Sequence, residues 1–498
     1  MAHDNLDITI QPQDNLNCRI SCDSGIAYEI YERLSFFAEG YKYMPRYKSG
    51  QWDGKIRLFD LRTRSLPIGL IPTLMTWAED NEYSIGVTGD FLEKIQIDDD
   101  VLLSIWKESK FKPKEHQIRA TVEALKSKRL LILSPTASGK SYIIYGIVRY
   151  LLALQEGGIL ICVPSTQLVE QLYSDFCDYQ NGTWDVEADV HRLYSGKDKN
   201  TDKRVVLSTW QSVYKLGAEW FQRFNTLICD EAHGADGKSI SGIVQKMNWA
   251  EYRIGLTGTL DGTMMHELEM RARFGDILVA TTTRKLMDAG DVADLTIDCI
   301  HLKYPEEDRK ALQKLNYEQE IDYIVSSDVR NNLLCNLAVK SEGNTIMLFN
   351  FIERQGTKLH NILKEKAAEH GKQVFYIDGS VDVGEREVIR QTLETKRNCI
   401  LLCSYGTTST GINIKNVDNA IFCHPFKGNI RNLQSIGRIL RVSETKTKSK
   451  LIDIGDDFTY TTSKGNAKPN TLFDHFVHRL EMYSDQGFDY KVIPLELK

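Results

Sequence analysis

The most constraining feature of this sequence is an alternation of short apolar runs with longer amphipathic stretches, which extends from about residue 110 to 460. One series of runs reads RLLILSP, GGILICVP, RVVLST, NTLICDE and YRIGLTGT, and a second reads NTIMLFN, KQVFYIDG, CILLCS, NAIFCHP and KLIDIG. Strands that alternate with helices form parallel sheets with helices on both faces. We therefore expect an α/β protein with two consecutive parallel-sheet domains, joined through a charged and mainly helical stretch at about 305–342.

The two ends of the chain differ from this pattern. Residues 1–105 contain short alternating runs separated by glycine turns, which indicates a small β-rich or α+β accessory domain. After a link rich in Ser, Gly, Asn, Lys and Pro, apolar residues recur at helical spacing near the C-terminus. A length of 498 residues is consistent with about three domains and a tail. The expected boundaries are 1–105 for the accessory domain, 106–282 and 283–460 for the sheet domains, and 461–498 for a small helical segment.

Nothing in the sequence indicates a membrane or an oxidising compartment. No run approaches the roughly 18 apolar residues of a membrane span, and the first ten residues lack the basic and apolar regions of a leader. Ten cysteines in so long a chain are not a disulfide framework. We expect a cytoplasmic protein without a membrane partner.

The first candidate site is a phosphate-binding loop that follows the apolar run at 130–133 and precedes a helical pattern. In such a loop the backbone amides hold the phosphates, Lys140 reaches the β and γ oxygens, and the Ser141 hydroxyl binds Mg²⁺. The short pattern also occurs by chance, and a second copy at 237–239 lacks a preceding strand, so we interpret that copy as a solvated loop entering a helix. The expected nucleotide-binding residues are Pro135, Thr136, Ala137, Ser138, Gly139, Lys140 and Ser141.

A second motif, Asp230-Glu231-Ala232-His233, ends another apolar run in the same domain. Carboxylates at the carboxyl end of a parallel strand point toward the crevice where nucleotides bind. Asp230 is a candidate second ligand of Mg²⁺, and Glu231 is placed to orient and deprotonate the attacking water. We group His233 with the nucleotide-binding residues. The alternative interpretation is an acidic helix cap beside an ordinary histidine.

A third motif lies in the second sheet domain, where helical spacing puts Gln434, Arg438 and Arg441 on one face. Two planar cations on one face suit a γ-phosphate that gains charge in the transition state. A basic helix exposed to solvent is the alternative. Taken with the other two motifs, this one predicts an ATP site to which both domains contribute, so that ATP hydrolysis moves a bound strand in steps.

These motifs resemble those of superfamily 2 helicases over about 110–460, which also share Leu-Thr-Gly-Thr at 256–259 and Gln-x-x-Gly-Arg-x-x-Arg at 434–441. Nearly the whole chain resembles the UvsW type of phage DNA helicase more closely. The segments that carry this second resemblance are 45–57, 237–241 and 404–412, and the first is the most specific because it lies outside the motor domains. The resemblance implies two tandem RecA-like domains and, for a phage-encoded chain, the host cell cytoplasm.

The resemblance also implies roles for individual residues. Gln117 would contact the adenine edge, and Thr257 and Thr259 would couple the nucleotide site to the DNA track. Strand phosphates would be contacted in the two domains by Pro164, Thr166, Thr209 and Thr410. Gly411 and Asn413 would lie near the ribose and phosphates, although Asn413 stands where many relatives carry Asp. Simple turn capping is the alternative for the threonines.

Basic and aromatic residues are interleaved at 41–64. This segment contains seven Lys or Arg residues and two Asp residues, so its net charge is +5 in a chain whose formal net charge is −6. Cations bind phosphates and aromatic rings stack on unpaired bases. The alternative is a surface β-hairpin whose aromatic side chains form its core, and strand alternation allows both at once. The predicted nucleic-acid contacts in this segment are Lys42, Arg46, Lys48, Trp52, Lys55 and Arg57.

We therefore expect an ATP-dependent, Mg²⁺-requiring DNA helicase or translocase. By resemblance it would unwind or remodel branched or forked DNA, including Holliday junctions and D-loops, and RNA:DNA hybrids, in phage recombination, repair and replication. Phage recombination proteins and single-strand-binding proteins are its expected partners. Two alternatives stay open: a duplex translocase of the restriction or remodelling type without strand separation, and an ATP-gated DNA clamp or annealing module. Intact Glu231, Arg438 and Arg441 argue against the clamp.

Overall fold

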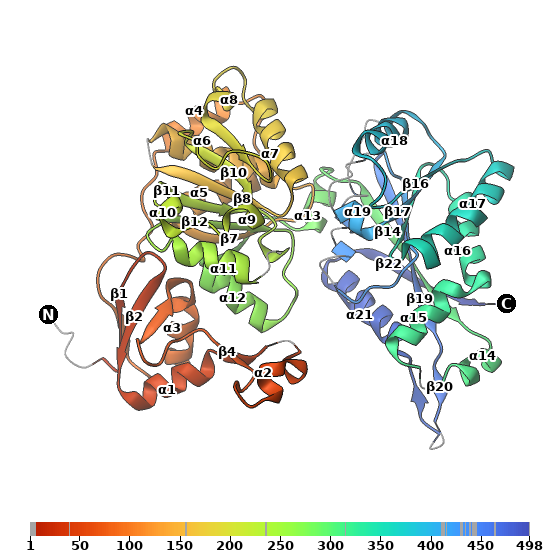
Figure 1. Cartoon of the computed structure of the whole chain (residues 1–498), viewed down its shortest axis with the longest axis horizontal. Coiled ribbons are helices and arrows are strands. Elements are labelled where there is room, and N and C mark those ends of the chain that lie inside the picture. The colour runs from red at the N-terminus through yellow and green to blue at the C-terminus, as the bar shows by residue number, and fades with distance from the viewer. Residues whose placement is uncertain are drawn as a thin grey trace. The chain divides into compact units, whose positions relative to one another are not determined.

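Two seven-stranded parallel sheets form the centres of the two units of the chain in the computed structural model (Figure 1). The first unit comprises Met1–Ser134 and Gly139–Ala280, and the second comprises Pro135–Ser138 and Thr281–Lys498. The structure describes residues 6–38, 40–154, 157–234, 237–313, 315–409, 414, 416–428, 432–433, 435–437, 440, 446–462 and 465–497. Within these ranges no helix combines the length and the apolar character that crossing a membrane requires.

The first unit begins with an α+β domain, as the sequence predicts. Its four-stranded sheet has the order β5-β2-β1-β6, in which β1 is antiparallel to β2 and parallel to β6. Apolar side chains of α1 and α3 pack with those of the sheet to form the core of this domain. The elements are β1 (Ile8–Pro12), β2 (Asn17–Cys22), α1 (Ser24–Arg33), β5 (Ser65–Pro67), η2 (Ile68–Leu70), α3 (Ile71–Asp80) and β6 (Ile85–Val87).

The basic and aromatic segment is only partly a hairpin. β3 (Ser35–Phe37) and β4 (Lys55–Arg57) pair antiparallel, but the chain between them forms two helical turns, η1 (Tyr41–Tyr43) and α2 (Pro45–Lys48). Pro45 stands at the first position of α2, where its fixed φ favours a helix and its missing N–H leaves no bond unmade. Strand alternation therefore does not sort the side chains of residues 41–48 as the hairpin interpretation expects.

The sheet of the first parallel-sheet domain is entirely parallel, with the order β13-β7-β12-β11-β8-β10-β9. One of its faces packs against α4, α5, α6 and α7, and the other packs against α9, α10, α11 and α12. The predicted parallel sheet with helices on both faces is confirmed. The strands are β7 (Arg129–Leu133), β8 (Gly158–Val163), β9 (Val190–Leu193), β10 (Val205–Thr209), β11 (Phe224–Cys229), β12 (Tyr252–Thr257) and β13 (Asp276–Val279). The helices are α4 (Asp99–Glu108), α5 (Glu115–Ser127), α6 (Lys140–Ala153), α7 (Thr166–Tyr179), α8 (Val186–Asp189), α9 (Trp210–Val213), α10 (Ala218–Phe221), η3 (Ala232–Gly234), α11 (Gly237–Lys246) and α12 (Met264–Phe274).

The accessory domain is anchored to this sheet within the first unit. The carbonyl oxygen of Asn15 accepts hydrogen bonds from Arg129 Nε at 3.0 Å and from the guanidinium of buried Arg253. Asn15 Nδ2 donates to the Trp249 carbonyl at 2.6 Å. At Gly69 an added Cβ would lie 1.8 Å from the Arg271 carbonyl, so only glycine allows η2 and α12 to approach this closely.

The sheet of the second unit is also entirely parallel, in the order β16-β17-β15-β18-β19-β14-β22. Helices α15, α16 and α17 cover one face, and α13, α18 and α21 cover the other. The strands are β14 (Asp294–Lys303), β15 (Thr345–Phe349), β16 (Gln373–Ile377), β17 (Cys399–Ser404), β18 (Asn419–Phe422) and β19 (Lys448–Asp457). The helices are α13 (Thr283–Asp288), α14 (Glu306–Ala311), α15 (Tyr317–Ser326), α16 (Asp328–Lys340), η4 (Ile352–Gly356), α17 (Thr357–Glu369), α18 (Val383–Thr395) and α19 (Tyr405–Ser409).

The C-terminal segment contains more than the helix that the sequence predicts. A short hairpin of β20 (Tyr460–Thr461) and β21 (Ala467–Lys468) precedes α21 (Thr471–Asp485). The chain then forms β22 (Asp489–Glu496), which pairs parallel with β14 at the edge of the sheet. Almost all side chains of β22 are exposed, and its sequence mixes charged and apolar residues. It therefore lacks the apolar run that identifies a buried strand.

Candidate active site

The expected order of strand, phosphate loop and helix is present at 129–153. β7 leads into the loop, and α6 begins at Lys140. Ala137 and Gly139 both have positive φ, 68° and 82°, and Ser138 Oγ donates to the Pro135 carbonyl at 2.7 Å. A positive φ is unusual for alanine, and it turns the backbone sharply just before the helix N-terminus. Such a loop presents its amides to an anion at the start of α6.

Lys140 reaches the motif that follows β11. Its Nζ lies 3.4 Å from Glu231 Oε1 and 3.3 Å from the Ser134 carbonyl. The Ser134 amide donates to the Thr257 carbonyl at 2.9 Å, which ties the loop to the end of β12. The lysine and the carboxylate that the sequence places 91 residues apart are thus neighbours.

Asp230 and Glu231 lie at the carboxyl end of β11, as the sequence predicts. The Glu231 amide donates to Asp230 Oδ1 at 2.9 Å. Burial raises the pKa of Asp230 above its usual range, and the adjacent Glu231 carboxylate adds to the rise while Lys140 opposes it. A buried acidic group with a raised pKa in a crevice is typical of a functional site.

His233 lies beside two other predicted residues. Its Nδ1 is 2.5 Å from Thr257 Oγ1 and 3.5 Å from Glu231 Oε2, while Thr257 Oγ1 donates to the Thr259 carbonyl at 3.0 Å. Burial lowers the pKa of His233, which favours the neutral ring. The histidine therefore connects Glu231 to the threonine motif at the end of β12.

Gln117 lies against the phosphate loop. Its side chain is buried, and its Oε1 accepts a hydrogen bond from the Lys114 amide at 2.9 Å at the start of α5. A Cβ added at Gly139 would lie 2.3 Å from Gln117 Nε2. The glycine thus makes room for the glutamine that the resemblance assigns to the base of the nucleotide.

One neighbour of the loop was missed by the sequence analysis. Ser141 Oγ lies 2.7 Å from the hydroxyl of Tyr179, the last residue of α7. Tyrosine on an amphipathic helix usually indicates packing, and 38 residues separate the pair, so only contact information would have indicated Tyr179.

The nucleic-acid contacts predicted for the first parallel-sheet domain lie at the carboxyl ends of β8 and β10. Pro164 is half-buried and Thr166 is exposed at the start of α7, where the Ser165 hydroxyl caps the helix. Thr209 is buried, and its Oγ1 lies 2.8 Å from Ser212 Oγ. The hydroxyl of Thr209 is thus engaged in a local turn, whereas Thr166 faces solvent.

The predicted contacts of the accessory domain fall into two groups. Lys55 Nζ lies 2.6 Å from Glu32 Oε2, and Arg57 pairs with Asp53, so both cations already have carboxylate partners. Trp52 Nε1 donates to the Lys55 carbonyl at 2.8 Å. Lys42, Arg46 and Lys48 are exposed, and none of them forms an ion pair with a carboxylate of the described residues.

Several predicted residues lie outside the part of the chain that the structure describes: Gln434, Arg438, Arg441, Thr410, Gly411 and Asn413. The second Gly-Lys-Ser copy is not the solvated loop that the sequence analysis expects: residues 237–239 form the first turn of helix α11, and Ser239 is buried.

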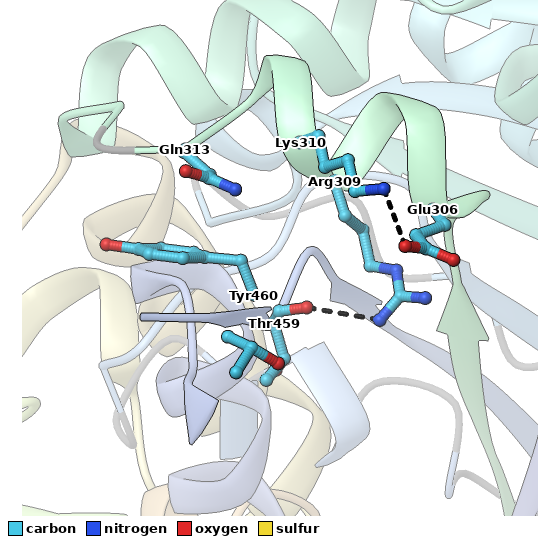
Figure 2. Close-up of a pocket in the computed structure, with 7 residues that line it drawn as sticks. Glu306, Arg309, Lys310, Gln313, Thr459 and Tyr460 are labelled. Carbon is cyan, nitrogen blue, oxygen red and sulfur yellow. Dashed lines mark hydrogen bonds and ion pairs between the residues drawn. The ribbon is translucent and has the colours of Figure 1, made fainter. Parts of the chain in front are cut away.

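A pocket of about 220 Å³ in the second unit lies apart from these motifs in the sequence (Figure 2). Glu306, Arg309 and Lys310 of α14 line it together with Gln313 and residues 459–461. Lys310 Nζ lies 2.7 Å from Glu306 Oε1, and Arg309 Nη1 donates to the Thr459 carbonyl. Its cations are already engaged, and no predicted site residue lines it, so we assign no ligand to this pocket.

Three family models match the chain. The N-terminal domain of the DNA helicase UvsW matches residues 7–88, the res subunit of type III restriction enzymes matches 110–262, and the helicase conserved C-terminal domain matches 329–443. The two motor domains are therefore the tandem RecA-like domains of a helicase, which confirms the expected fold.

Relatives match over much of the chain. The ATP-dependent DNA helicase uvsW of Enterobacteria phage T4 is 34% identical over 97% of this chain and 99% of the relative. A DNA 3′-5′ translocase, XPB2 of Sulfurisphaera tokodaii, is 26% identical over 70% of this chain and 84% of the relative. The crystal structure of T4 UvsW matches with a TM-score of 0.52 at 31% identity, covering 99% of this chain and 100% of that one. A fragment of a putative HsdR subunit of a type I restriction enzyme from Vibrio vulnificus shares the fold, with a TM-score of 0.58 at 18% identity over 80% of this chain and 72% of that one.

Proposed function

The chain belongs to the UvsW family and is an ATP-dependent DNA helicase, and from this premise we propose that it remodels branched DNA such as forks, Holliday junctions and D-loops. We propose RNA:DNA hybrids as a further substrate, and phage recombination and single-strand-binding proteins as partners. The observation that carries the proposal is the exposed group of cations and aromatic rings at 41–48 in the accessory domain. A helicase needs no such surface to move along one strand, but a branch point offers phosphates and unpaired bases together.

The side chains of this segment suit such a substrate. Tyr43 is 81% exposed, and the exposed Lys42, Arg46 and Lys48 surround it in sequence. Phe37 and Tyr41 stack with ring centroids 4.5 Å apart, and Tyr47 meets Tyr41 edge-on at 4.8 Å. These three rings hold the two helical turns on the hairpin, which leaves Tyr43 to stack on a base while the cations bind phosphates. We propose residues 1–105 as the nucleic-acid-binding domain, with Lys55, Arg57 and Trp52 shaping its surface.

The proposed ATP chemistry uses Lys140, Glu231, Gln117 and His233 of the first unit together with three residues of the second. Lys140 binds the β and γ phosphates, and Glu231, held 3.4 Å from Lys140, orients the attacking water and accepts its proton. Gln117 contacts the base, and His233 with Thr257 links Glu231 to the strand track at the ends of β8 and β10. We propose 106–282 and 283–460 as the limits of the two motor domains, with 461–498 as a C-terminal segment whose β22 extends the sheet of the second. Gln434, Arg438 and Arg441 of the second domain act on the γ-phosphate.

The residues at the site fit Mg²⁺ as the metal. Ser141 and Asp230 supply a hydroxyl and a carboxylate oxygen, which are ligands that this hard cation prefers. The described residues contain no cluster of three or more His, Cys, Asp or Glu side chains that could hold a metal by themselves. Mg²⁺ usually keeps several waters and takes substrate phosphates as further ligands, so two protein oxygens suffice. Bound Mg²⁺ would supply positive charge beside the γ-phosphate.

A panel of DNA structures tests the proposed substrate. Strand separation and ATPase rates would be compared on single strand, blunt duplex, fork, four-way junction, D-loop and RNA:DNA hybrid, with the Glu231→Gln variant as the inactive control. We expect the fork, the junction and the D-loop to be processed at least about tenfold faster than blunt duplex. Equal rates on all duplex substrates would contradict the branched-DNA proposal. ATP-driven movement along duplex without product strands would support the restriction-type translocase instead.

A further inference from the structure

The proposed metal ligand Ser141 has a neighbour that orients its hydroxyl. The 2.7 Å distance between Ser141 Oγ and the Tyr179 hydroxyl is that of a good hydrogen bond, and either oxygen can donate. A serine hydroxyl carries one proton and two lone pairs. When the Ser141 hydroxyl donates a hydrogen bond to the Tyr179 oxygen, both lone pairs of Ser141 Oγ are left for a cation. When the proton points elsewhere, it competes with the cation for the same space.

Tyr179 is held firmly enough to set this orientation. Its ring meets Tyr142 edge-on at 4.8 Å, Tyr145 at 5.6 Å and Phe111 at 5.9 Å. Its backbone carbonyl accepts a hydrogen bond from the Lys110 amide at 2.9 Å. A hydroxyl on a ring packed on several sides has little freedom to move, so it constrains its partner instead.

We propose that Tyr179 is a positioning residue of the Mg²⁺ site: its hydroxyl oxygen accepts a hydrogen bond from the Ser141 hydroxyl, which leaves the Ser141 Oγ lone pairs available to the metal. The inference rests on the proposed role of Ser141 as a Mg²⁺ ligand. In this role Tyr179 acts through its hydrogen bond to Ser141.

Binding of a fluorescent, non-hydrolysable ATP analogue to the full-length protein tests this role. The readout is the free Mg²⁺ concentration that gives half-maximal enhancement of analogue binding, with affinity in EDTA as the reference. Tyr179→Phe keeps the ring and removes the hydroxyl, and it should raise the half-saturating Mg²⁺ concentration about three- to tenfold while affinity in EDTA stays unchanged. Thermal unfolding of the same samples checks that the ring packing is intact.

The matched control is Tyr145→Phe. Tyr145 belongs to the same ring cluster, but its hydroxyl accepts a hydrogen bond from Arg149 at 3.0 Å. We expect wild-type Mg²⁺ dependence for Tyr145→Phe, and we expect Ser141→Ala and Ser141→Ala/Tyr179→Phe to give the same raised value. A Tyr179→Phe protein with wild-type Mg²⁺ dependence would overturn the inference, as would an equal shift in Tyr145→Phe or a further loss in the double variant. If Ser141→Ala itself leaves Mg²⁺ dependence unchanged, the Mg²⁺ assignment falls and the inference falls with it.

Discussion

Glu231 lies two residues after the end of buried strand β11 and has a backbone φ of 50°, a conformation that residues with a side chain rarely adopt. Holding a non-glycine residue there costs about 1 to 2 kcal/mol. Strain of this kind persists where the surrounding structure fixes a functional side chain. Here the turn brings Glu231 Oε1 within 3.4 Å of Lys140 Nζ, so the backbone conformation places the proposed base beside the proposed phosphate-binding lysine.

For Lys140 and Glu231 we predict two different defects, one in ATP hydrolysis and one in ATP binding. Glu231→Gln keeps the shape of the side chain but removes the base, so DNA-stimulated ATPase should fall at least about a hundredfold while ATP still binds. Lys140→Ala removes the cation and should weaken ATP binding as well. Phosphate release at saturating DNA measures ATP hydrolysis, and binding of a non-hydrolysable ATP analogue measures ATP binding. The control is Glu187→Gln, at an exposed position of α8. Turnover near wild type in either site variant would remove that residue from the catalytic assignment.

From the surroundings of His475 we predict that the folded protein loses stability in acid. The ring of His475 is half-buried beside Tyr317, and this burial lowers its pKa to about 4, with Lys427 and Arg479 adding to the effect. The unfolded chain binds a proton near pH 6.5 and the folded chain only near 4, so stability falls as pH drops through this window. Between pH 7.5 and 5, His475→Gln should lose about 1 to 2 kcal/mol less than wild type, allowing for partial exposure. Urea unfolding at both pH values measures this difference, with His370→Gln, a substitution at an exposed position of the same unit, as the control for replacing a histidine.

Helix α21 is joined to the sheet of the second unit by buried polar contacts as well as by apolar packing. Arg479 Nε and Nη2 bind the two oxygens of Asp453 on β19 at 2.8 and 2.9 Å, and both side chains are almost fully buried. The Tyr483 hydroxyl donates to the same carboxylate at 2.9 Å. At the other end of the helix, the Glu320 carboxylate accepts the amides of Thr471 and Leu472. The helix therefore belongs to the second unit as an integral element.

The Arg479 pair gives a prediction for stability. Arg479→Met leaves the Asp453 carboxylate buried without its cation, which should lower the free energy of unfolding by about 3 to 5 kcal/mol. Lys310→Ala is the control, because Lys310 and Glu306 form an exposed pair that should contribute at most about 1 kcal/mol. Chemical denaturation of both variants measures the difference. A loss below 1 kcal/mol in Arg479→Met would mean that the ion pair with Asp453 does not hold α21 on the sheet.

For the segment between β3 and β4, we predict which cations bind DNA from whether they already have carboxylate partners. Changing Lys42, Arg46 and Lys48 together to alanine should weaken junction binding and reduce the slope of log affinity against log salt by about 3, since each phosphate contact contributes about one. Lys55→Met with Arg57→Met should change the slope less, because these cations already pair with Glu32 and Asp53. DNA-independent ATPase should survive in both. A larger slope change in the second variant would reverse the assignment.

At the scale of the whole molecule, what the sequence predicts is what short-range patterns determine. The apolar runs identify the strands, and the motifs at the ends of β7 and β11 place Lys140 and Glu231 at one edge of a parallel sheet. The contact of Ser141 with Tyr179 spans 38 positions, and that of Arg253 with Asn15 spans 238. Such pairs depend on how distant segments pack, and no local pattern encodes them. β22 was missed because an exposed edge strand carries no apolar signal.

The sequence prediction that both motor domains contribute to hydrolysis can be tested in the full-length protein. Arg438→Ala and Arg441→Ala remove cations assigned to the γ-phosphate, so DNA-stimulated turnover should fall at least about a hundredfold, because charge stabilisation in the transition state is lost. Binding of the non-hydrolysable ATP analogue should change less than about threefold, because Lys140 and Ser141, which we propose to bind the phosphates and Mg²⁺, belong to the first unit and are unchanged. Arg397→Ala, which removes an exposed partner of Asp418, is the control in the second unit. Turnover that survives in both arginine variants would mean that the first motor domain hydrolyses ATP without them, and stepping would then need another cause.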